Sequence, residues 1–195
     1  LKMTELNTLK EYLKKVINDG ELDYCLLEII NSFSLLQLNK NDFFVKEGAV
    51  CSYFGFIESG ILQHSSIVLG EEKTTYLALK NSCVSALKSF LKKTSSRKNI
   101  KALSDCKLWV IDCDKFNALI KNNKAFHTFY FNLIENQIFL IDDYRIDLLT
   151  LTAEERYQKM LVNEPSLLQE VPLHYLASFL GISSRHMSRI RKNIK

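Results

Sequence analysis

The stretch PLHYLASFLGISSRHMSRIRKNIK, residues 172–195, determines the predicted fold at this end of the chain. The apolar residues spaced to form the buried face of a first helix are Leu173, Leu176, Ala177 and Leu180. Gly181 supplies a sharp turn, Ile182 fills the space between the helices, and Ser183 can cap a second helix. In this second helix Met187 and Ile190 are predicted to face inward. This succession of apolar helix face, glycine turn and second apolar helix face predicts a helix-turn-helix.

The outward face of the second predicted helix is basic. Between positions 185 and 195 there are five basic residues and no acidic one: Arg185, Arg189, Arg191, Lys192 and Lys195. A helix of this kind can enter the major groove of DNA, where arginine bonds guanine bidentately and lysine neutralises phosphates. The candidate DNA-binding residues are Ser183, Ser184, Arg185, His186, Ser188, Arg189, Arg191 and Lys192. The alternative is a solvated basic helix packed on its own domain.

A long helix is predicted upstream, capped by Asn122-Asn123 and ending near Leu149. Its apolar residues step by three or four positions, and the stripe is wide enough to face both its own barrel and a second copy of the chain. The candidate dimerisation residues are Phe126, Tyr130, Leu133, Gln137, Ile141, Tyr144 and Leu148. Thr152 and Glu155 form a capping-box pattern that starts another helix, so residues 150–152 are predicted to be a hinge.

The region from Ser34 to Asp114 has a different pattern. Short runs rich in β-branched and aromatic residues alternate with polar turns, as expected of a small antiparallel barrel. The predicted strands are residues 43–45, 53–57, 60–64, 74–77 and 108–111, with glycine turns at Gly60 and Gly70. Helices are expected over residues 6–16, 23–31 and 116–121, and residues 82–93 are compatible with a helix. The predicted fold class is α+β: a jelly-roll barrel domain (1–114), a dimerisation segment (115–149) and a helical domain (150–195).

Composition restricts the remaining function classes. The 195 residues are 47% hydrophobic and 25% charged with a net charge of +4, which is typical of a globular protein without a membrane span. The N-terminal residues lack the apolar stretch of a signal peptide, so a cytoplasmic location is expected. The five cysteines are scattered and form no C-x-x-C pair. We therefore expect reduced thiols, no metal site and no cofactor.

Residues 151–195 strongly resemble the C-terminal domain of Crp/Fnr-type regulators, in the form common in Bacteroidetes, and residues 56–62 (FIESGIL) resemble the family's barrel strand pair. The resemblance implies a cyclic-nucleotide-binding-like jelly roll, a homodimer along the long helix, and winged-helix-like domains that bind double-stranded DNA. Ser184, Arg185 and Arg189 match its principal base-reading positions, with His186 and Ser188 beside them.

One departure from the family pattern is informative. Members that bind cyclic nucleotide carry a Gly-Glu motif followed by Arg-Ser/Thr-Ala, whereas residues 82–97 lack it, and no glycine lies between Gly70 and Gly181. The backbone can approach a phosphate closely only where no side chain intervenes, so we expect no response to cyclic AMP. The basic residues Lys88, Lys92, Lys93 and Arg97 are expected to form a solvated surface, with binding of another anion as the alternative.

Two other interpretations remain at this stage. A barrel can also support a cupin-like metal enzyme, but the four histidines (His64, His127, His174 and His186) are isolated from one another, so we do not expect the protein to be an enzyme. Alternatively, the barrel of a degenerate regulator serves only for contact with a protein such as RNA polymerase. A polar pocket in the barrel would favour an unknown small-molecule effector, and a barrel filled by apolar side chains would favour the scaffold.

Overall fold

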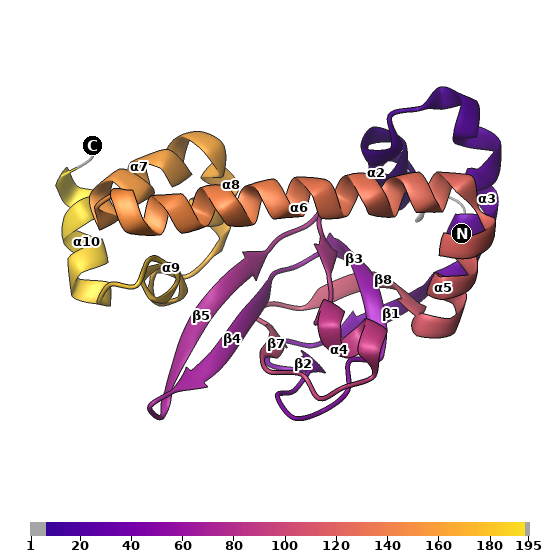
Figure 1. Cartoon of the computed structure of the whole chain (residues 1–195). Coiled ribbons are helices and arrows are strands. Elements are labelled where there is room, and N and C mark those ends of the chain that lie inside the picture. The colour runs from indigo at the N-terminus through magenta and orange to yellow at the C-terminus, as the bar shows by residue number, and fades with distance from the viewer. Residues whose placement is uncertain (1–6, 194–195) are drawn as a thin grey trace.

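The computed structural model describes residues 7–193 and is built around one long helix, α6 (Lys124–Thr150). The N-terminal helices lie at one end of α6, the C-terminal helices lie at the other, and a β-barrel occupies the space beneath its middle (Figure 1). None of the helices in this part of the chain combines the length and apolar character of a membrane span.

The barrel consists of two four-stranded antiparallel sheets, which confirms the predicted α+β class. One sheet has the order β1 (Ser34–Leu38), β8 (Cys106–Asp112), β3 (Tyr53–Ser59) and β6 (Cys83–Val84). The other, which we call the docking sheet, has the order β2 (Phe43–Val45), β7 (Asn99–Ala102), β4 (Leu62–Val68) and β5 (Glu71–Ala78). A core rich in phenylalanine, including Phe54, Phe56, Phe90 and Phe116, fills the region between the sheets and the covering helices.

All five predicted strands are present, and the structure adds β1, β6 and β7. In β1 only Leu38 is buried, so its hydrophobic pattern is weak. The Gly60 turn is sterically required: its φ is +96°, and a Cβ at this position would lie 2.5 Å from the Asp105 carbonyl oxygen. Within residues 82–93 the structure has β6 followed by a short helix, α4 (Leu87–Lys92), rather than one continuous helix.

The helices before the barrel depart from the expectation in one place. Helix α2 (Asn7–Ile17) buries Leu9, Leu13 and Ile17; Leu6, at the start of the predicted helix, lies outside the described residues. The second predicted helix is divided into a 3-10 turn, η1 (Gly20–Cys25), and α3 (Leu26–Ser32). The Asp19 side chain accepts a hydrogen bond from the Glu21 amide and fixes the start of the tighter turn.

Four helices follow α6, namely α7 (Ala153–Asn163), α8 (Pro165–Glu170), α9 (Leu173–Leu180) and α10 (Ser184–Asn193). The predicted capping box of α7 is confirmed, because the Thr152 amide donates to Glu155 Oε2 at 2.7 Å and the Glu155 amide donates to Thr152 Oγ1 at 3.3 Å. The Thr152 amide and hydroxyl, which both donate to the Glu155 carboxylate, hold the pKa of Glu155 below its usual value. Pro165 opens α8, one residue after the Glu164 cap that follows α7.

Candidate nucleic-acid interface

Helices α9 and α10 are joined by a tight turn at Gly181. Gly181 has a φ of +72°, its amide donates to the Ser178 carbonyl at 3.1 Å, and the Ile182 amide donates to the Ala177 carbonyl at 3.0 Å. Ala177 is 1% exposed, and its small side chain allows the two helices to approach closely.

The start and the inner face of α10 are fixed by three residues. The Ser183 hydroxyl accepts a hydrogen bond from the His186 amide at 3.2 Å and caps the helix, as predicted. Met187 and Ile190 are fully buried in a cluster with Leu176 and Leu180. The other side chains of α10 therefore point away from this cluster.

The eight candidate DNA-binding residues all lie on α10 or its cap. Those exposed to solvent are Ser183, Ser184, Arg185, Arg189, Arg191 and Lys192, whereas His186 and Ser188 are half-buried. Residues 185, 188, 189 and 192 share one face by helical spacing, and residue 191 lies two turns after 184. No ion pair involving these basic side chains occurs within residues 7–193, so their charges are free. Lys195 lies outside the described residues.

Contacts that the sequence did not indicate hold α9 against α6 and α7. The Tyr144 ring stacks on Phe179 with centroids 5.4 Å apart, and the Tyr144 hydroxyl donates to the Phe179 carbonyl at 3.3 Å. Burial raises the pKa of Tyr144, so it stays a neutral donor. Arg156 Nη2 donates to the Leu180 carbonyl at 2.9 Å, which satisfies the end of α9.

The α9–α10 unit also packs on the docking sheet. Ile61, Leu77 and Leu103, all at this sheet, belong to the same buried cluster as Met187 and Ile190. At the edge strand β5, the Thr74 amide donates to the Ser178 hydroxyl of α9 at 2.9 Å. The orientation of α10 is therefore linked to the barrel through a shared hydrophobic core.

The candidate dimerisation stripe is partly corrected. Phe126 is fully buried within its own subunit, Tyr130 and Leu133 pack against the barrel core, and Tyr144 contacts α9. The sequence shows two apolar faces on α6, but periodicity cannot tell which one the barrel and α5 (Cys113–Asn122) cover. Of the remaining candidates Gln137 is half-buried, while Ile141 and Leu148 are exposed.

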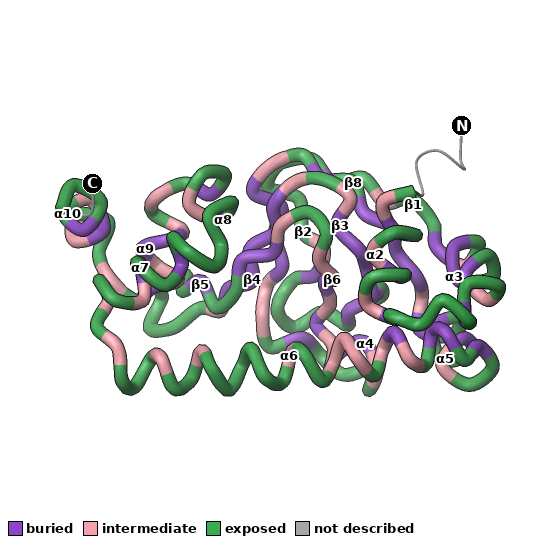
Figure 2. The backbone as a smooth tube through the Cα atoms, turned by 90° about the horizontal axis from the view of Figure 1, so that it is seen from above, coloured by how far each residue is buried: buried purple, intermediate pink, exposed green. Residues whose placement is uncertain are grey.

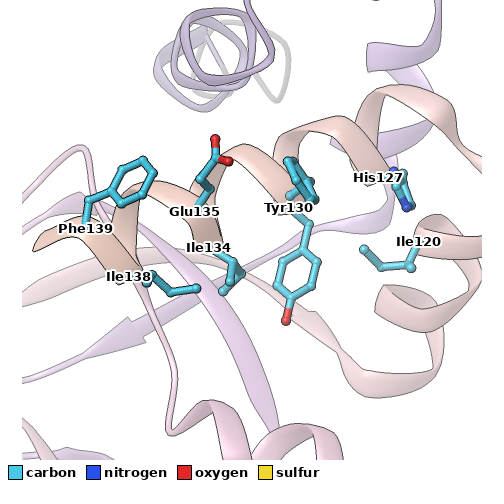
Figure 3. Close-up of a pocket in the computed structure, with 8 residues that line it drawn as sticks. Ile120, His127, Tyr130, Ile134, Glu135, Ile138 and Phe139 are labelled. Carbon is cyan, nitrogen blue, oxygen red and sulfur yellow. The ribbon is translucent and has the colours of Figure 1, made fainter. Parts of the chain in front are cut away.

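A second apolar face of α6 is open to solvent. Phe131, Ile138 and Ile141 are 59%, 58% and 58% exposed, and they recur with Ile134 at a spacing of three and four residues. A groove of about 530 Å³ follows this face, lined by Ile120, His127, Tyr130, Phe131, Ile134, Glu135, Ile138 and Phe139. Figure 3 shows the side chains of Tyr130, Ile134 and Ile138 on the side of α6 where Ile120 of α5 lies, whereas Glu135 is on the opposite side of the helix. The tube in Figure 2 shows α6 exposed along much of its length.

Metal-binding side chains are not clustered within residues 7–193. No group of three or more histidine, cysteine, aspartate or glutamate side chains is arranged to bind a metal ion in the part of the chain that the structure describes. The buried cysteines Cys51, Cys106 and Cys113 are free thiols.

Comparison with known proteins supports the architecture. Residues 35–123 match the cyclic nucleotide-binding domain family. FixK2 from Bradyrhizobium japonicum superposes with a TM-score of 0.71 at 12% identity, over 83% of this chain and 84% of that one. A Eubacterium rectale protein assigned to the Crp/Fnr family of transcriptional regulators gives a TM-score of 0.64 at 14% identity, over 90% and 82% of the two chains. The chain has the fold of Crp/Fnr-type regulators.

Another similar structure matches a smaller share of the chain. The regulatory domain of Toxoplasma gondii PKA, solved with cAMP, has a TM-score of 0.52 at 20% identity, over 60% of this chain. This chain spans 44% of that domain's length. No curated protein matches the sequence. The matches to FixK2 and to the Eubacterium rectale protein extend over a larger share of this chain, 83% and 90%.

Proposed function

We propose that the protein is a DNA-binding transcription regulator that works as a homodimer. The observation that carries this proposal is α10, where Met187 and Ile190 anchor one face while Arg185 and Arg189 project unpaired from the other. In the major groove, Arg185 and Arg189 would bond guanine edges, and Lys192 would neutralise a phosphate. Ser183 and Ser184, at the start of the helix, lie where free amides attract a phosphate.

The exposed face of α6 supports the dimer. An apolar row of this length in water is stabilised when it is covered, and pairing with a second α6 covers both copies at once. Two copies of α10 would then read a pseudo-palindrome whose half-sites are about 34 Å apart, one turn of DNA. Residues 150–152, between α6 and α7, would set that separation.

The proposal includes no response to cyclic AMP. Residues 82–97 form β6, α4 and a loop without the Gly-Glu and Arg-Ser/Thr-Ala residues that hold the nucleotide in binding members of the family. This region instead contains Phe90, which is fully buried and packs edge-on against Phe116 with the ring centroids 5.3 Å apart. We expect cyclic AMP to leave the melting temperature and the DNA affinity of the protein unchanged.

The test is a selection of bound duplexes from a randomised pool at moderate salt, followed by sequencing. We expect a two-fold-symmetric motif with half-sites one turn apart. The Arg189→Ala variant should select a motif that has lost its base preference at one position. The Lys88→Ala variant, with the same charge change on the barrel, should select the wild-type motif. Retention without any motif, in the presence or absence of cell extract, would contradict sequence-specific binding.

A further inference from the structure

A buried histidine on the inner face of the barrel, His64, contacts the half-buried side chain of Lys98. His64 in β4 pairs with Ile100 in β7, and both Ile100 and the neighbouring Leu62 belong to the barrel core. Lys98 lies in the bend directly before β7, and its side chain is half-buried. Its Nζ atom lies 2.9 Å from His64 Nδ1, and His64 is only 5% exposed.

This pair can only donate hydrogen bonds. Burial, and then the nearby Lys98 charge, lower the pKa of His64 well below its usual value, so the ring is neutral. Because Nδ1 accepts from the Lys98 ammonium, the ring proton lies on Nε2. Nε2 is buried and has no hydrogen-bond partner within residues 7–193. A buried donor without an acceptor is unfavourable, so a ligand that accepts a hydrogen bond from Nε2–H would stabilise the site.

No carboxylate of the described chain completes the pair. Lys98 is absent from the ion pairs formed within residues 7–193. Glu72, on the adjacent strand β5, lies on the outer face, where it accepts from Ser65 Oγ at 2.8 Å and faces Lys101 Nζ at 3.5 Å. Tyr76, which pairs with His64, contributes its ring at 5.3 Å in an edge-on arrangement.

The segment of the chain that contains Lys98 is rich in basic residues. Residues 73–104 contain eight lysines or arginines and no aspartate or glutamate. Lys88, Lys92, Lys93 and Arg97 are exposed and form no ion pair in the described part of the chain. Clustered charge of one sign raises the local concentration of ions of the other sign.

We propose that Lys98 and His64 bind a small oxyanion, a carboxylate or phosphate group, inside the barrel. The Lys98 ammonium would balance its charge, and His64 Nε2–H would donate the second hydrogen bond. The anion would be an effector only if the proposed regulator function holds, whereas the proposal that it binds does not depend on that function.

The experiment uses the full chain without DNA. Its melting temperature is measured against sodium acetate and sodium phosphate, each compared with sodium chloride at equal ionic strength. We expect a saturable rise with one or both oxyanions, and the arm that responds identifies the anion class. Lys98→Met should weaken binding at least tenfold, whereas Lys92→Met, with the same charge change on the exposed surface, should bind as the wild type does.

A second measurement keeps the test informative if Lys98→Met does not fold. In the wild-type protein, the NMR signal of His64 Nε2 should shift with the same saturation curve as the melting temperature. The proposal is overturned if neither oxyanion acts beyond chloride, if Lys98→Met binds like the wild type, or if the His64 signal does not move. If the protein binds an oxyanion but selects no DNA motif, the proposed regulator function is refuted and the proposed anion site is not.

Discussion

At the residue scale, the proposed function separates side chains that read bases from those that hold phosphates. Arg189 projects from the middle of α10, and Lys192 lies one turn later on the same face. Arg189→Ala should cost about 1–3 kcal/mol on the preferred site and blunt discrimination at one base pair. Lys192→Ala should weaken binding to all sequences alike and reduce its salt dependence. Titrating both variants on matched and single-mismatch duplexes checks this, and identical behaviour across the duplexes would refute the division of roles.

A second residue-scale prediction concerns the Gly181 turn. A Cβ at Gly181 would meet no atom within 4 Å, so Gly181→Ala tests the backbone alone. Because φ is +72°, an L-residue there should destabilise the fold by about 1–2 kcal/mol. Gly20→Ala is the control, since Gly20 has equally open space without a positive φ. Denaturant midpoints measure both, and equal midpoints for the two variants would show that the left-handed conformation carries no cost here.

At the element scale, the sequence predicts those features that depend on residues close together in the chain. The Thr152 capping box, the Gly181 turn and the buried Leu176 and Ile190 are each specified by residues within a few positions of one another. The short strands β1, β6 and β7 and the orientation of α6 depend on distant partners, so periodicity alone could not specify them. The same limit applies to the Lys98–His64 contact, which joins residues 34 positions apart across two strands.

The open face of α6 gives the element-scale prediction. Ile138→Asp places a charge in the proposed helix pair, where desolvation without a partner is costly, and should convert the dimer to monomer at micromolar concentration. Asn136→Asp is the matched control, because it adds the same charge at an exposed polar position of the same helix. Sedimentation equilibrium measures both. A wild-type monomer, or a dimer unaffected by Ile138→Asp, would show that this face of α6 does not pair.

At the scale of the whole molecule, strand β4 connects the two sites. His64 faces the barrel interior, whereas its neighbour Gln63 faces outward and donates to Thr74 Oγ1 at 2.9 Å beneath the helical domain. The Thr74 amide in turn donates to Ser178 of α9. A ligand that shifts β4 from inside the barrel would therefore also shift α9, which packs on the opposite face of the same sheet. Such a ligand would act by favouring one orientation of α10.

This coupling predicts cooperative unfolding of barrel and helical domain. Trp109 is the single tryptophan and lies in β8, so its fluorescence follows the barrel, whereas ellipticity follows all helices. The two melting curves should coincide for the wild type. Phe179→Ala removes the ring that stacks on Tyr144 and should release the helical domain, so that ellipticity falls before the fluorescence changes. Phe43→Ala, the same truncation at an exposed site on β2, should keep the curves together. Coincident curves for Phe179→Ala would mean that the Tyr144–Phe179 stack is dispensable, and that the hydrophobic cluster at the docking sheet alone holds the two parts together.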